Sequence, residues 1–276
     1  MSRVLFSMLV LVLMSGWISG ITPVSQAKVI GAWLFNEGKG NVAKDSAGNG
    51  FDLEVVKGKW LEGGGSYDGA LGFSMATYAW IEVKKKDAEF NLDKGEFTII
   101  TRGYLTGLSS CCAGIPRWEA LSGDFDRAGW LIHPDTGAPD YVFSWWYNDG
   151  GWTKAGSSGA LKFKAEWHQF AVTFDTKRIL MYLDGEEIAD FPANRGPTPF
   201  EDGGTLTYSR DRCCVPPRMF TGAIDESLIA DEAFSAAVIA ESAKKGLQNT
   251  AAFRQVFAVD ARGKLATTWS RLKTLN

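Results

Sequence analysis

The sequence has few histidines and cysteines and no long basic run. Its 276 residues include two histidines and four cysteines, and no run of lysine and arginine is longer than three. Acidic residues outnumber basic ones, 32 against 29, which gives a formal charge of −3. Without a broad basic surface, nucleic acid is not an expected partner. The histidines, His133 and His168, have no metal-ligand spacing, and His168 alternates with apolar residues as a packed, hydrogen-bonded side chain would.

Long apolar runs are also scarce. The run from Val4 to Met14 is too short for a membrane-spanning helix, which takes about 20 residues. Arg3 precedes it and Ser25-Gln26-Ala27 follows, which is the pattern of a signal peptide over residues 1–27. We therefore expect a secreted protein, extracellular or periplasmic, that begins at Lys28 and has no membrane span after cleavage.

The sequence is rich instead in short alternating apolar segments separated by glycine-containing turns. Clear examples are 97–104 and 167–174, and Asp184-Gly185 is typical of a type I′ hairpin turn. One helix is predicted over 236–245, with Ser235 as its cap and Gly246 as its end. Many short strands with such turns predict an all-β sandwich of two sheets or a jelly roll.

Five motifs follow one another along the chain: Trp33-Leu34-Phe35-Asn36-Glu37-Gly38-Lys39-Gly40 with Asp45-Ser46-Ala47-Gly48-Asn49-Gly50, then Gly69-Ala70-Leu71-Gly72-Phe73, Trp167-His168-Gln169-Phe170-Ala171, Tyr182-Leu183-Asp184-Gly185 and Phe220-Thr221-Gly222-Ala223-Ile224-Asp225-Glu226. In this order they resemble the bacterial laminin-G-like domains of the concanavalin A-like superfamily. The resemblance implies an antiparallel two-sheet jelly roll over 28–246 with one short helix near its end. Residues 247–276 would then form a C-terminal tail.

The resemblance also implies a structural calcium ion that joins the first and last strands. Its ligands would be Asp225 and Glu37 or neighbouring carbonyl oxygens, because Ca²⁺ takes oxygen ligands. An equally open interpretation is that Asp225 accepts backbone hydrogen bonds at the end of a strand.

Catalysis is not expected from the carboxylates. Laminarinase-type glycoside hydrolases of this superfamily carry E-x-D-x-E on one strand, and the sequence has no such string. Glu186 and Glu187 are adjacent, so on a strand they point apart, and Asp124 and Asp126 lie in a glycine- and serine-rich insert. We therefore expect a non-catalytic carbohydrate-binding module. A glycoside hydrolase and a protein-interaction or adhesion module at the cell surface are the alternatives.

Aromatic residues between 141 and 152 make a polysaccharide or glycan the expected partner, since sugars stack their C–H faces on aromatic rings. Alternation places residues 141, 143, 145 and 147 on one face of a strand and 142, 144 and 146 on the other, and one face must be core. The predicted ligand-binding residues are Trp118, Arg127, Trp145, Tyr147, Asp149 and Trp152.

The four cysteines form two adjacent pairs, Cys111-Cys112 and Cys213-Cys214. Export favours disulfides. The resemblance implies that strands over 97–104 and 219–230 pair antiparallel, which would bring the two cysteine pairs together as cross-loop disulfides. A vicinal disulfide within each pair and a four-thiolate metal site are the alternatives.

Overall fold

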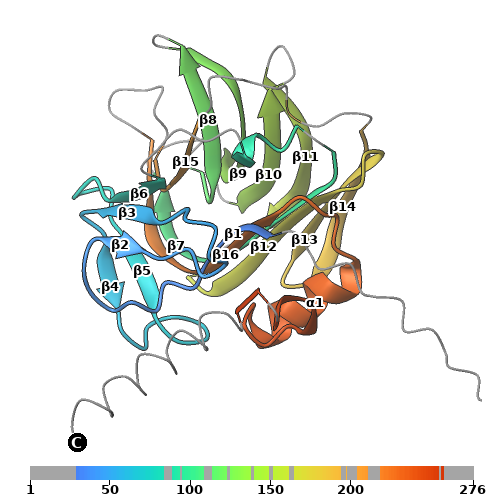
Figure 1. Cartoon of the computed structure of the whole chain (residues 1–276). Coiled ribbons are helices and arrows are strands. Elements are labelled where there is room, and N and C mark those ends of the chain that lie inside the picture. The colour runs from blue at the N-terminus through green and yellow to red at the C-terminus, as the bar shows by residue number, and fades with distance from the viewer. Residues whose placement is uncertain are drawn as a thin grey trace, which may run out of the picture.

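The computed structural model describes residues 29–83, 89–93, 95–108, 114–122, 125–137, 140–148, 152–161, 165–193, 197, 204–210, 218–254 and 256–257 (Figure 1). Their strands form two sheets that face each other, and all pairings between described strands are antiparallel. The predicted two-sheet jelly-roll sandwich is confirmed.

Sheet 1 contains the first and last described strands, which lie next to each other. Its order is β14 (Glu186–Pro192), β13 (Arg178–Leu183), β12 (Trp167–Phe174), β7 (Phe97–Leu108), β16 (Phe220–Ala230), β5 (Ala70–Phe73) and β4 (Lys59–Leu61), with β1 (Val29–Trp33) paired to β16. Residues 98–108 of β7 pair with β16, so the antiparallel pairing implied by the resemblance is confirmed.

Sheet 2 joins strands from the middle of the chain to strands from its first third, and a strand from the last third, β15 (Thr205–Tyr208), lies between the two groups. Its order is β11 (Trp152–Leu161), β10 (Asp140–Asn148), β9 (Phe125–Gly137), β8 (Arg117–Ser122), β15, β6 (Trp80–Val83), β3 (Leu53–Val56) and β2 (Val42–Ala43). A short 3₁₀ turn, η1 (Glu89–Asn91), precedes β7 and contributes the buried Phe90.

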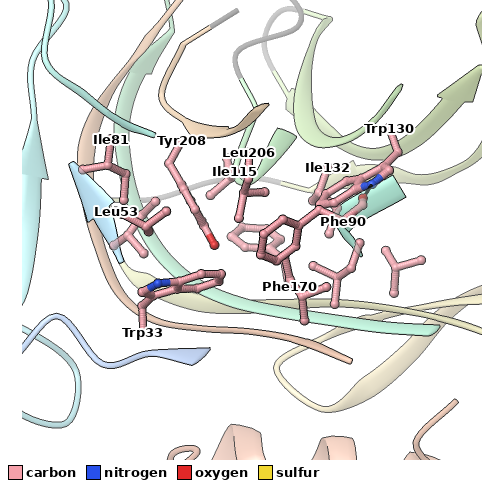
Figure 2. Packing of buried hydrophobic residues seen from close by; sticks show 14 of the residues in the cluster. Trp33, Leu53, Ile81, Phe90, Ile115, Trp130, Ile132, Phe170, Leu206 and Tyr208 are labelled. Carbon is pink, nitrogen blue, oxygen red and sulfur yellow. Dashed lines mark hydrogen bonds between the residues drawn. The ribbon is translucent and has the colours of Figure 1, made fainter. Parts of the chain in front are cut away.

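The main core lies between the sheets because alternate residues of each strand point into this space. On β12, Phe170, Val172 and Phe174 belong to the core, whereas Ala171 belongs to a second apolar cluster on the other side of sheet 1. Figure 2 shows Trp33 of sheet 1 reaching toward residues of sheet 2. Its indole N–H donates to the Phe51 carbonyl at 2.8 Å, so this buried polar group is satisfied.

The helix α1 (Ala236–Lys245) covers part of the outer side of sheet 1, over the second cluster (Figure 1). Its predicted bounds are confirmed, and Gly246 ends it at φ 79°. Ser235 stands at the predicted cap position, with extended backbone, although its side chain makes no cap hydrogen bond. Packing continues past residue 246, where we expected a tail, because Leu247 and Phe253 are fully buried in the second cluster.

The hairpin turn between β13 and β14 has the predicted type I′ geometry. Asp184 has φ 51° and Gly185 φ 87°, which type I′ turns require at both central residues. The turn lies against α1, and a Cβ atom at Gly185 would come within 2.8 Å of the Ala240 Cα. Glycine at 185 therefore serves both the turn and the contact with the helix.

The opening motif has a structural role centred on Asp45. Its Oδ1 accepts from the backbone N–H of Ala32 and Ala47, and its Oδ2 accepts from those of Asn49 and Phe51, at 2.9–3.2 Å. One buried carboxylate thus orders the loop and fastens it to β1. Within the described part of the chain, no helix is long and apolar enough to cross a membrane.

Candidate functional site

Two of the predicted ligand-binding residues lie in the core. Trp145 is 0% exposed and Tyr147 is 7% exposed. Trp145 packs against Phe97 and Trp130, with ring centroids 5.5 and 5.7 Å apart. The prediction that Trp145 and Tyr147 contact a ligand was therefore wrong, because their face of β10 is the one that fills the space between the sheets.

The other described candidates also lie on sheet 2. Trp118 stands opposite Trp130 and Leu206 in the strand ladders, and both of these partners are core residues. Arg127 is the additional residue of a bulge, because Ala128 and Asp126 pair with the consecutive residues 120 and 121. Trp152 pairs with Asn148 at the start of β11. Asp149 lies outside the described residues.

A row of mutually opposite positions crosses seven strands of sheet 2. Directly opposite residues of antiparallel strands share one side of the sheet. On β3 and β6, Leu53 and Ile81 are buried in the core whereas Glu54 and Glu82 are half-exposed, so the row lies on the outer side. We call it the outer row; it comprises Glu54, Glu82, Thr207, Arg117, Leu131, Trp146 and Lys154.

The centre of the outer row is covered. Thr207, Arg117 and Leu131 are 0%, 2% and 3% exposed although they occupy outward positions. The row therefore has a half-exposed carboxylate end at Glu54 and Glu82 and a buried guanidinium in its middle. Trp146 and Lys154 stand at its far end, and the paired Asn148 and Trp152 lie two residues further along the same two strands.

Beside the carboxylate end of the row lies Trp80, which was not among the predicted site residues. The Arg210 guanidinium lies over the Trp80 ring, 4.3 Å from its centroid, and its Nη1 lies 3.9 Å from Glu82 Oε2. Such cation–π contacts favour Arg on Trp. The Trp80 Nε1 and Arg210 Nε atoms are buried without a hydrogen-bond acceptor. From the sequence, the only sign of this group is that Trp80 and Glu82 alternate with the apolar residues Ile81 and Val83, which places both on the outward side of the strand.

A second polar cluster lies on the outer side of sheet 1. A bulge in β16 spans Asp225 and Glu226, because Ile224 pairs with Gly103 and Ser227 with Thr101. Asp225 Oδ2 accepts from the backbone N–H of Ser66 at 2.6 Å and of Tyr67 at 2.9 Å. Both oxygens of Glu226 accept from the Leu247 N–H, at 3.1 and 3.0 Å. The two carboxylates thus hold distant segments against the last strand.

Burial dominates the electrostatics of this cluster. It raises the pKa of Asp225 to about 6, against the opposing effects of the Tyr67 and Ser66 N–H groups and of Arg102. It raises the pKa of Glu226 to about 7, against the Leu247 N–H, and the neighbouring Asp225 charge adds to the rise. Removing a carboxylate from water disfavours its charged form, and one guanidinium does not offset two such groups.

These contacts bear on the expected calcium site. Asp225 accepts backbone hydrogen bonds, as in the alternative interpretation. Glu37 Oε1 accepts from the Lys44 N–H at 2.7 Å, its Oε2 is buried without a partner, and burial raises its pKa, to which Asp52 adds. The described residues contain no group of three or more His, Cys, Asp or Glu able to hold a metal ion. This arrangement does not fit one calcium ion shared by Asp225 and Glu37; calcium binding stays a prediction, which melting curves in calcium and in EDTA would test.

His168 has the packed, hydrogen-bonded environment that its alternation predicted. Its Nδ1 lies 2.7 Å from Asp184 Oδ2, and Asp184 Oδ1 accepts from the Gln169 N–H at 2.8 Å. The four cysteines lie outside the described residues, so their pairing stays a prediction.

The two-sheet antiparallel sandwich with one short helix is the fold of concanavalin A-like domains. Residues 76–240 match the Laminin_G_3 family, described as the concanavalin A-like lectin/glucanases superfamily. The match covers more than half of the chain, and the chain belongs to this family. No curated protein matches it significantly.

Solved structures of similar fold include sugar-binding proteins. Domain 4 of AbnA, an extracellular GH43 arabinanase from Geobacillus stearothermophilus solved with arabinotriose, has a TM-score of 0.60 at 14% identity, covering 79% of this chain and 99% of that one. The binding domain of Paraclostridial mosquitocidal protein 1 has a TM-score of 0.56 at 15% identity, covering 77% and 51%. A structure of botulinum neurotoxin type C, whose cell entry depends on two ganglioside molecules, has a TM-score of 0.51 at 14% identity, covering 79% and 51%. The chain thus spans about half the length of the two toxin chains, and at these identities the likeness concerns the fold.

Proposed function

We propose that the protein is a secreted, non-catalytic glycan-binding module and that the β10–β11 end of the outer row contacts the glycan. The family contains lectins; among structures of similar fold, one was solved with arabinotriose and another belongs to a toxin whose cell entry depends on gangliosides. The absence of an E-x-D-x-E string from the sequence supports a binding role over hydrolysis.

The observation that carries this proposal is the register of sheet 2. It aligns Trp146 and Lys154 on the outer side and places Asn148 and Trp152 beside them. Sugar recognition needs an aromatic surface for C–H faces and polar groups for hydroxyls. The residue types at this end of the row supply both.

Glycan-array binding of the mature protein tests the proposal. The array should include arabinotriose and ganglioside oligosaccharides, and we expect Trp146→Ala to weaken the strongest signals about tenfold, which is about 1.4 kcal/mol. Lys154→Ala should weaken them less, and Lys244→Ala on α1 is the matched control that should leave them unchanged. Equal binding by wild type and Trp146→Ala would reject this surface.

Export and the absence of catalysis are parts of the proposal with their own tests. N-terminal sequencing of exported protein should give Lys28 as the first residue, and an intact Met1 on secreted material would contradict cleavage. Incubation with laminarin-type glucans should release no reducing sugar. Release that disappears in Glu119→Gln or Asp126→Asn would make a glycoside hydrolase the better description.

A further inference from the structure

The outer side of sheet 1 is only partly covered. Arg102 of β7 stands opposite Gln169 of β12, and Tyr104 stands opposite Trp167. The second pair lies two residues further along each strand, so both pairs are on the same side of the sheet. Arg102 Nη2 donates to the Ala243 carbonyl at 2.7 Å, and Gln169 Nε2 donates to the Ile239 carbonyl at 3.3 Å. Helix α1 thus covers the Arg102–Gln169 pair and ends at Lys245.

Tyr104 and Trp167 form an aromatic pair beyond this cover. Their ring centroids lie 5.6 Å apart with an interplanar angle of 48°. Both side chains are half-exposed, and neither belongs to the core or to the second apolar cluster. Their packing therefore contributes to neither cluster, although an aromatic side chain ordinarily gains most of its free energy from burial.

The surroundings of the pair are polar. Within the described part of the chain, neither the Tyr104 hydroxyl nor the Trp167 indole N–H makes a protein hydrogen bond. Thr106 follows on the same side of β7, is exposed, and donates its hydroxyl proton to the Thr221 carbonyl at 3.2 Å, which leaves its oxygen lone pairs available. Tyr67, 38% exposed, stacks over Arg102 at 4.7 Å. The pair therefore offers two rings, the free Tyr104 hydroxyl and the free Trp167 indole N–H, with the Thr106 hydroxyl on the same strand.

We propose that the Tyr104–Trp167 pair is a second glycan-contact site, which binds an oligosaccharide by stacking on adjacent sugar rings. Protein-interaction sites are typically contiguous apolar surfaces of several hundred Å², whereas here the exposed, polar Thr106 follows the pair on β7. A sugar matches both features, because its C–H face covers a ring and its hydroxyls reach the hydroxyl and N–H groups at the edge. The site shares its class of ligand with the proposed function but none of its residues.

The two sites lie on opposite sides of the sandwich, because one is on the outer side of sheet 1 and the other on the outer side of sheet 2. One molecule then holds two glycan chains at once. Because the sites face in opposite directions, the two chains lie on either side of the molecule, and the protein can cross-link them when both are within reach.

Paired variants on the same glycan array separate the two sites. We expect Trp167→Ala to reduce glycan signals about tenfold and Trp167→Phe to retain most of them, since phenylalanine preserves a stacking ring. Loss in Trp146→Ala with no change in Trp167→Ala overturns the second site and leaves the proposed function standing. Loss in Trp167→Ala alone supports the second site and rejects the outer row. No glycan bound by wild type overturns both.

Oxidation by N-bromosuccinimide provides a measurement that does not depend on a variant being stable. The best array glycan, added to wild type, should slow oxidation of Trp167 several-fold, as read by peptide mass spectrometry. Trp60, whose indole N–H donates to the Gly40 carbonyl at 2.8 Å, serves as the internal control and should react equally with and without glycan. Equal oxidation of Trp167 under both conditions would overturn the second site.

Discussion

The Tyr208 hydroxyl lies 2.7 Å from the Ser227 hydroxyl and joins the two sheets through the core. Ser227 is also 2.7 Å from the Thr101 hydroxyl and 3.2 Å from the Ile100 carbonyl. Figure 2 shows Tyr208 above Trp33. Tyr208 is fully buried, and burial raises the pKa of its phenol above the ordinary value. A phenol at this depth remains neutral and needs a hydrogen-bond partner, which the other sheet supplies.

Tyr208→Phe should therefore lower the free energy of unfolding by about 1 kcal/mol, the net value of a typical buried hydrogen bond. The loss is moderate because Ser227 keeps its contacts with Thr101 and Ile100. Urea unfolding measures it, and Tyr78→Phe, at a residue 45% exposed, is the matched control expected within about 0.5 kcal/mol of wild type. A Tyr208→Phe variant as stable as wild type would show that the inter-sheet bond adds nothing.

Asp45→Ala should cost more, about 2–4 kcal/mol, because it leaves buried N–H groups of the opening loop without an acceptor. The control is Asp175→Ala, since Asp175 accepts from the backbone N–H of Lys177 and Arg178 in an exposed turn. We expect a smaller loss there because water replaces the carboxylate. Equal losses in urea unfolding would contradict the central role of Asp45.

The sequence determined the fold more fully than the site, and the residues show why. Two-residue alternation on β12 and the Asp184-Gly185 turn follow from local backbone geometry, so both were predictable. Alternation on β10 separated Trp145 from Trp146 correctly. It did not identify the buried side, because that depends on which face sheet 1 covers.

The polar cluster on β16 was not predictable in the same way. Adjacent strand residues ordinarily point apart, and the bulge at Asp225 and Glu226 changes this. Their partners, Ser66, Tyr67 and Leu247, are distant in sequence. The Tyr104–Trp167 pair was missed for a related reason, since only the end of α1 decides which part of sheet 1 stays uncovered.

Stability should fall as pH rises from about 5 to 8. The folded-state pKa values of Glu226, about 7, and Asp225, about 6, lie above the ordinary values of 4.5 and 3.8, so the folded protein holds protons that the unfolded chain has lost. This contribution is fully present below the unfolded pKa values and is lost as pH rises through 6 and 7. We expect the free energy of unfolding to decrease by about 4 kcal/mol over this range, because Glu226 keeps its additional proton over about two pH units and Asp225 over about one.

Urea unfolding at a series of pH values measures this effect. Glu226→Gln should remove most of the slope between pH 5 and 8, because glutamine has no proton to lose and only Asp225 still contributes. Glu241→Gln is the control, since Glu241 is half-exposed and pairs with Lys245 at 2.9 Å on the surface of α1. A wild-type curve without slope would show that Arg102 and the backbone N–H groups fully compensate both carboxylates.

The two cysteine pairs should be joined to each other by cross-loop disulfides. Phe220 pairs with Leu108, so the end of β7 lies beside the start of β16. Cys112 follows the first strand and Cys213 precedes the second, each within a few residues. Closing a loop of roughly 100 residues stabilises the fold by about 4–5 kcal/mol in the chain-entropy model. A vicinal disulfide would instead have to form between adjacent Cα atoms about 3.8 Å apart, below the usual disulfide range of about 4.4–6.8 Å.

Peptide mapping without reduction should find residues 111–112 linked to 213–214. Separate peptides, each lighter by two hydrogens, would establish vicinal disulfides, and four free thiols that bind zinc would favour the metal site.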